Sequence, residues 1–173
     1  LREMMKKSYE ILKDHPLNKE REAKGLHPAN CCWFWGAGTR PALTSFEKKT
    51  GRKGMMVSAV DLLKGIAHGA EMGVAEVEGA NGGLNTNYEG KAQAALDALL
   101  KQGYDFAYVH LEAPDEMGHQ GSAEKKVKSI ENLDSRIIAN VCKGMDESGI
   151  PYRMLIMPDH PTPVRLRTHV SDP

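Results

Sequence analysis

Apolar residues along the chain gather in short runs that alternate with amphipathic segments. Short apolar runs predict strands at residues 30–35, 53–58, 74–78, 104–111 and 152–157. Apolar side chains at helical spacing predict helices at residues 2–13, 43–49, 59–67, 90–101 and 122–146. Because strands that alternate with helices build parallel sheets covered by helices, the chain is predicted to adopt an α/β fold with a mainly parallel sheet flanked by helices.

The segments around these elements carry further signals. The polar and basic residues 17–29 predict a surface connection. The run 30–35 is predicted to be a buried strand, with Trp33 and Trp35 in or beside the core. Ser122 is expected to cap the last helix, because a serine hydroxyl accepts a hydrogen bond from a free amide of the first turn.

Length and charge exclude several classes of function. With 173 residues the chain can bury a core of its own, and its formal net charge is zero. A neutral chain gives no reason to expect nucleic acid or an anionic membrane surface as a partner. No apolar run approaches the roughly 20 residues that span a bilayer. Three cysteines without zinc-like spacing favour free thiols, so a cytoplasmic location is expected.

The chemistry-bearing residues gather in the last third of the chain. Asp115 and His119 are predicted to lie in a tight loop after one strand, Asp159 and His160 follow another strand, and His169 comes shortly afterwards. Ligands bind at the carboxyl ends of parallel strands, so these side chains are expected to converge. Either pair by itself more often forms a turn or a helix cap, but two pairs with a third histidine favour a metal site.

Five ligands exceed what one ion can use while keeping a position open for substrate. Two ions can share them, with Asp159 and His160 on one ion and Asp115, His119 and His169 on the other. Mixed carboxylate and imidazole ligands suit Mn²⁺ or Zn²⁺ better than Ca²⁺. Two such ions about 3.5–4 Å apart form the usual clamp for phosphoryl chemistry. His110, inside a strand, is expected to be a core residue or a support for the ligands.

These stretches are similar to a known family. Residues 110–121 read His-Leu-Glu-Ala-Pro-Asp-Glu-Met-Gly-His-Gln-Gly, and residues 157–163 read Met-Pro-Asp-His-Pro-Thr-Pro. They closely resemble the archaeal-type, cofactor-independent phosphoglycerate mutases of the alkaline phosphatase superfamily. The likeness extends over nearly the whole chain, through residues 14–19, 28–30, 35–41, 58–66, 85–92 and 167–173.

The resemblance implies a glycolytic enzyme that interconverts 2- and 3-phosphoglycerate through a phosphoserine, with two divalent metals. It assigns Asp115, His119 and His169 to one metal and Asp159 and His160 to the other. The family completes the second site with an early Asp and the nucleophilic Ser, which the resemblance places upstream of this chain. Residues 1–173 are therefore expected to be the C-terminal part of a phosphatase- or mutase-like domain, truncated at both ends, with a partial alkaline phosphatase-like core.

A phosphorylated metabolite with a carboxylate needs fixed positive charge, for which Arg40, Arg167 and Lys64 are candidates. The alternative is that these charges only solvate the surface. The loop Asn81–Gly83 offers backbone amides to an anion, but a plain turn is favoured.

Other functions stay open beside the mutase. A related phosphotransferase or hydrolase, under the label of proposed homoserine kinase, and a non-catalytic metal-binding fragment both fit the motifs. In each case a small phosphorylated metabolite or a metal is the expected partner, not nucleic acid or membrane, and the oligomeric state is left open.

Overall fold

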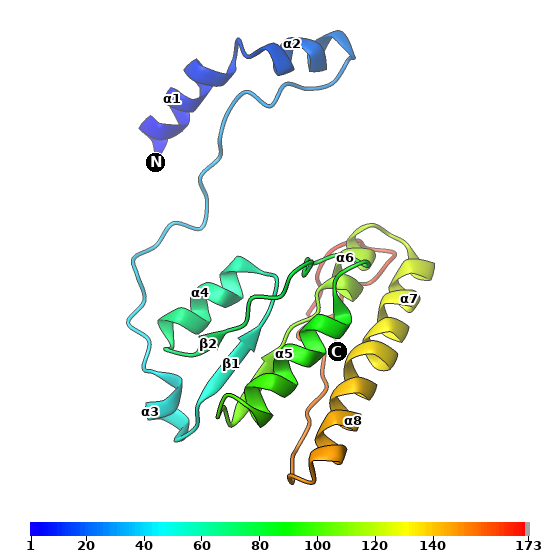
Figure 1. Cartoon of the computed structure of the whole chain (residues 1–173). Helices are drawn as coiled ribbons and strands as arrows, with labels where there is room; N and C mark the ends of the chain where they lie inside the picture. Colours follow the sequence, from blue (N-terminus) through cyan, green and yellow to red (C-terminus); the bar gives the residue numbers. More distant parts are fainter. Residues whose placement is uncertain (172–173) are drawn as a thin grey trace. The chain divides into compact units, whose positions relative to one another are not determined.

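The computed structural model describes residues 1–171 and divides the chain into two units, residues 1–41 and the part from Ala42 onwards (Figure 1). The first unit contains two helices, α1 (Arg2–Leu12) and α2 (Pro16–Ala23). Helix α1 matches its prediction, whereas the expected surface connection at 17–29 is wrong in its first part, which is α2. Pro16 starts α2 and the His15 ring accepts a hydrogen bond from the Leu17 amide. Pro16 and the His15 cap stabilise the start of this helix, although its polar sequence has no clear apolar face.

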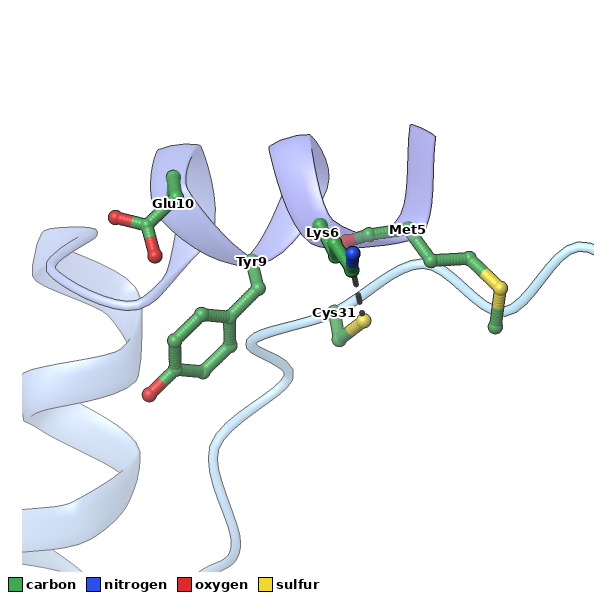
Figure 2. A pocket seen from close by; sticks show the side chains of 5 residues that line it. All are labelled: Met5, Lys6, Tyr9, Glu10 and Cys31. Atoms are coloured by element: carbon green, nitrogen blue, oxygen red, sulfur yellow. Dashed lines mark hydrogen bonds between the residues drawn. The ribbon is translucent and has the colours of Figure 1, made fainter. Parts of the chain in front are cut away.

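Asn18 holds the first unit together. Its side chain is buried, and its amide nitrogen donates to the carbonyl oxygens of Leu12 and Ala29 at 2.7 and 3.3 Å. Its amide oxygen accepts from the Ala29 nitrogen at 2.8 Å. A shallow hollow of about 410 Å³ lies beside α1, where the Cys31 thiol donates to the Met5 carbonyl (Figure 2).

The predicted strand at 30–35 is wrong. These residues have no strand partner, and Trp33 and Trp35 are 77% and 81% exposed rather than in a core. A strand needs a neighbouring strand to pair its backbone groups, and the described part of the first unit offers only helices.

The second unit is built on a parallel sheet in the order β2-β1-β3, so the predicted fold class is confirmed. Strand β1 (Gly54–Val57) lies in the centre, between β2 (Gly73–Val74) and β3 (Phe106–Val109). Gly54 pairs with Phe106 and Val57 with Val109, so β1 and β3 end at the same level. The predicted strand at 74–78 is wrong in most of its length, because β2 ends at Val74.

Helices surround this sheet, as the sequence pattern predicts. They are α3 (Phe46–Thr50), α4 (Asp61–Gly69), α5 (Tyr88–Leu100), α6 (Ala113–His119), α7 (Ala123–Leu133), the π-helical segment η1 (Asp134–Ile138) and α8 (Ala139–Ser148). Ser122 caps α7 by accepting a hydrogen bond from the Lys125 amide at 3.3 Å, as predicted. The expected helix at 122–146 is interrupted by η1. None of the helices in residues 1–171 combines the length and apolar character needed to cross a membrane.

Helix α5 contributes buried side chains to both clusters of the core. Its Ala95 and Ala98 pack with Met55 and Val57 of β1, and small side chains let the helix approach the sheet closely. On its other side, Tyr88 and Ala92 pack against residues of η1 and α8. Figure 1 shows α5 lying along the sheet. This packing fixes the carboxyl end of β3, from which the candidate site begins.

The run at 152–157, which predicts a strand, is not one in the structure. It forms no ladder, and Leu155 is 81% exposed. Its apolar character is that of a strand, but no strand in the described part of the chain pairs with it.

Candidate metal centre

Helix α6 presents the first two candidate ligands. The sequence predicts a tight loop here, but Ala113–His119 is helical, with Pro114 in its first turn and Glu112 at its N-cap position. Asp115 and His119 are therefore four residues apart on one helical face, where side chains meet. The Asp115 Oδ2 and His119 Nε2 atoms are 3.4 Å apart. A helix fixes these two side chains relative to each other more firmly than the predicted loop would.

His169 joins this pair from the C-terminal segment, which Figure 1 shows beside α6. Its Nε2 atom lies 3.2 Å from Asp115 Oδ1 and 3.0 Å from His119 Nε2. One ligand atom from each of the three residues lies within 4.8 Å of the other two. A carboxylate oxygen and two imidazole nitrogens directed at a common point fit a divalent ion of the zinc or manganese type. Asp115 and His119 are partly buried while His169 is exposed, which leaves one side of the group open.

The Arg167 carbonyl orients His119. The Nδ1 atom of His119 lies 2.9 Å from this oxygen, so Nδ1 carries the proton and donates it. The Nε2 lone pair is then free to face the other two residues, as in many histidine ligands of metals. Arg167 has a left-handed backbone with φ 55°, a conformation that costs a non-glycine residue about 1 kcal/mol. Its amide and that of Leu166 donate to the Pro163 carbonyl, and this turn supports the strained residue.

Asp159 and His160 lie next to this group. The His160 ring centroid is 3.8 Å from that of His169, and the two rings are tilted by 39°. Asp159 Oδ1 accepts from the His160 amide at 2.9 Å, and its Oδ2 is 3.5 Å from His160 Nε2. The Asp159 side chain is 69% exposed. The structure thus brings all five predicted ligand residues into one region, three of them as a tight group and two beside it.

The sequence interpretation overlooked Thr162. Its side chain is buried, and its hydroxyl donates to Asp115 Oδ1 and lies 3.3 Å from His160 Nδ1. Its only signal in the sequence is its place between two candidate ligands.

Behind the ligands lies a layer of buried polar groups. Burial lowers the pKa of His110, an effect that the carboxylates of Asp159 and Asp115 partly offset; its ring lies 3.4 Å from the Ser58 hydroxyl. Burial also lowers the pKa of Lys91, whose ammonium group lies 3.4 Å from the carbonyl oxygens of Asn81 and His110. Lys91 thereby ties the loop around Asn81 to the end of β3. This matches the expectation that His110 is a core or supporting residue.

Glu112 completes this layer at the start of α6. Burial raises the pKa of its carboxyl, and the nearby Glu116 and Asp115 carboxylates raise it further. Its carboxylate lies against Gly82, where a side chain would clash.

The candidate substrate residues have other surroundings. Lys64 forms an ion pair with Glu76 at 3.0 Å, and Arg167 is exposed with its guanidinium against Gly121. Arg40 is exposed in the first unit.

The loop at 81–83 is a turn, the reading that the sequence favoured. The Gly83 amide donates to the Asn81 side chain at 2.8 Å, and the Asn81 amide donates to the Thr86 hydroxyl at 2.9 Å. These two amides are therefore engaged within the loop.

Comparisons with known proteins agree with this chemistry. The sequence profile of a family described as "Metalloenzyme superfamily" matches residues 7–173. The chain is 49% identical over 171 residues to the 2,3-bisphosphoglycerate-independent phosphoglycerate mutase of Methanosarcina mazei, covering 99% of this chain and 43% of that protein. It is 47% identical to a probable enzyme of the same name from Geobacter sulfurreducens, covering 42% of it. The chain thus spans less than half the length of these curated relatives.

A solved structure is similar over nearly the whole chain. The structure of the PH0037 protein from Pyrococcus horikoshii matches 95% of this chain and 42% of its own length, with a TM-score of 0.73 and 30% identity. The arrangement of sheet and helices is therefore shared with an experimentally solved protein.

The Arg167 carbonyl, rather than its side chain, is predicted to support metal binding. Arg167→Gly keeps the carbonyl and favours the left-handed backbone, so Mn²⁺ affinity measured by titration calorimetry should stay unchanged. Arg167→Pro fixes φ near −65° and should weaken binding about 10- to 100-fold, as the loss of a ligand's support does. Arg165→Gly is the control for the loss of charge. A loss in Arg167→Gly equal to that in Arg167→Pro would assign the effect to the guanidinium instead.

The shifted pKa of His110 predicts a pH dependence of stability. Because the folded-state pKa lies below the usual 6.5, the unfolded chain binds more protons between the two values. The stability associated with neutral His110 is fully present above pH 6.5. It is lost as the pH drops from 6.5 through the folded-state pKa. Urea unfolding in EDTA at several values between pH 7.5 and 5.5 should show a smaller loss for His110→Gln, the difference staying below about 1.4 kcal/mol per pH unit. Identical pH profiles would contradict the assignment.

Proposed function

Because the chain belongs to the metalloenzyme superfamily, we propose that it carries most of the metal ligands of a two-metal phosphoglycerate mutase. The single observation behind this proposal is the group formed by Asp115, His119 and His169, whose ligand atoms lie within 4.8 Å of one another. The relatives are named 2,3-bisphosphoglycerate-independent phosphoglycerate mutases, and the reaction that we propose is the interconversion of 2- and 3-phosphoglycerate.

One ion is held by Asp115, His119 and His169 in this proposal. Helix α6 fixes two of these ligands, and the segment after Pro163 brings the third to them. The half-open side of the group leaves room for a substrate oxygen. Asp159 and His160 hold the second ion, together with an Asp and a nucleophilic Ser supplied by a part of the enzyme outside these residues. We propose Mn²⁺ or Zn²⁺ for both positions, because the ligands mix carboxylate with imidazole.

Two ions held by these residues would supply positive charge to a transferring phosphoryl group and to the serine hydroxyl that attacks it. The residues of this chain hold and orient the reacting groups. Arg167 lies in the turn that leads to His169, so its exposed guanidinium can contact a phosphate or carboxylate near the ligands. Arg40 and Lys64 are retained as further candidates for such contacts. A cytoplasmic, glycolytic role completes the proposal.

For residues 1–173 by themselves we propose metal binding without turnover. The reason is chemical: Asp159 and His160 provide two ligands, and in this proposal the serine that takes the phosphoryl group comes from another part of the enzyme. A related phosphotransferase or hydrolase remains the alternative for the whole enzyme, because it uses the same ligands.

Removal of one ligand is predicted to abolish tight metal binding by the chain. After dialysis, elemental analysis and calorimetry should find about one Mn²⁺ bound to the wild type. His119→Ala should weaken this binding by more than the roughly 100-fold that loss of a supporting residue causes. His68→Ala changes an exposed histidine of α4 and serves as the matched control. Equal losses in both variants, or no binding by the wild type, would count against the site.

Substrate profiling is predicted to separate the mutase from its alternatives. The longest natural protein that contains this chain should convert 2- to 3-phosphoglycerate without releasing free phosphate. The conversion can be measured by ³¹P NMR. Asp115→Asn should lower kcat by at least about 100-fold, because the ligand charge is lost. Release of phosphate without isomerisation would favour a hydrolase, and phosphorylation of another hydroxyl compound would favour a kinase.

A further inference from the structure

We propose that Thr162 is a positioning residue that links the two ligand groups and fixes the proton of His160 on Nδ1. This inference rests on the proposed metal centre and extends it to a residue that binds no metal. Thr162 is 3% exposed, and its hydroxyl contacts both Asp115 of the first group and His160 of the second. It therefore links them through its hydroxyl, in addition to the ring contact between His160 and His169.

The chemistry of the three groups sets the direction of the hydrogen bonds. An ionised carboxylate can only accept, so the hydroxyl proton of Thr162 points to Asp115 Oδ1. The hydroxyl oxygen then has lone pairs left for His160 Nδ1, 3.3 Å away. That contact is favourable only when Nδ1 carries the proton and donates it. The Nε2 atom of His160, on the side of Asp159 Oδ2, consequently keeps its lone pair for a metal.

The same rule applies to both α6 and the C-terminal segment. His119 donates its Nδ1 proton to the Arg167 carbonyl, and His160 donates its Nδ1 proton to Thr162. Each imidazole thus keeps its Nε2 unprotonated, and that of His119 lies 3.0 Å from His169 Nε2. Preparing the tautomer in advance removes a rearrangement from the binding step, which is the usual effect of such supporting hydrogen bonds.

Thr162 is held in place by contacts that involve no ligand residue. Its carbonyl accepts a hydrogen bond from the Lys126 ammonium of α7 at 2.8 Å. Gly118 of α6 makes room for it, since a Cβ at that position would clash with the Thr162 carbonyl and lie 3.0 Å from its methyl group. Thr162 is therefore held against α6 and α7 through its carbonyl and methyl group, independently of the groups that its hydroxyl orients.

The tautomer of His160 provides a direct test. Long-range ¹H–¹⁵N NMR on the metal-free chain at pH 8 should find His160 protonated on Nδ1. Thr162→Val keeps the shape but removes the hydroxyl, so a large share of His160 should move to the Nε2-protonated form. Thr162→Ser keeps the hydroxyl and should restore the wild-type tautomer. Because Asp115 also loses the hydrogen bond from Thr162, Mn²⁺ affinity should fall about 10-fold in Thr162→Val and recover in Thr162→Ser.

Thr86→Val is the matched control. Thr86 is also 3% exposed, but its hydroxyl accepts from the Asn81 amide and contacts no candidate ligand. The Thr86→Val variant also loses a buried hydroxyl, but it should leave the tautomer of His160 unchanged.

The outcomes separate this inference from the metal site itself. A wild-type His160 protonated on Nε2 overturns the inference without any variant, even if Thr162→Val fails to fold. An unchanged tautomer and Mn²⁺ affinity in a folded Thr162→Val also overturns it. A wild type that binds no Mn²⁺ defeats the proposed function, while the tautomer measurement still decides the role of Thr162.

Discussion

The site depends on a carboxylate and two imidazoles being held at contact distance. Asp115 and His119 achieve this because four residues of helix bring them to the same face of α6. His169 must then be delivered from a segment about fifty residues later, without regular secondary structure to guide it. The pair on α6 is fixed by local geometry, whereas the third ligand is fixed by tertiary contacts. Placing His169 is the more demanding requirement, because it depends on contacts between segments that are distant in the sequence.

The segment between Asp159 and His169 is ordered by hydrogen bonds to α6, which carries the other two ligands, and to the following helix α7. Thr162 contacts Asp115 and Lys126, and the Arg167 carbonyl contacts His119. Some of these bonds position the loop, and others orient the side chains that face it. The loop conformation and the ligand orientation are therefore parts of one network. This explains why a left-handed arginine backbone is tolerated at 167, since the bond to His119 compensates a local cost.

The sequence predicts the parts of the structure that depend on local periodicity. The central helices and the strands β1 and β3 follow from apolar spacing, and the candidate ligands follow from their place after apolar runs. Helix α6 was missed because Pro114 and Gly118 within seven residues indicate a loop, although proline suits the first turn of a helix. Thr162 and the Arg167 carbonyl could not be predicted, because their roles arise only when distant segments meet. Backbone groups carry no sequence signal at all.

The two strands that the sequence predicts and the structure lacks, at 30–35 and 152–157, share one physical cause. A helix satisfies its backbone groups internally, so a suitable local sequence is enough to form it. A strand satisfies them only through a neighbour, and parallel strands are normally covered on both faces. Leu155 and Trp35 stay exposed because the described residues offer no such neighbour. Apolar runs therefore identify surfaces that need to be covered, and only the neighbouring chain decides whether they are strands.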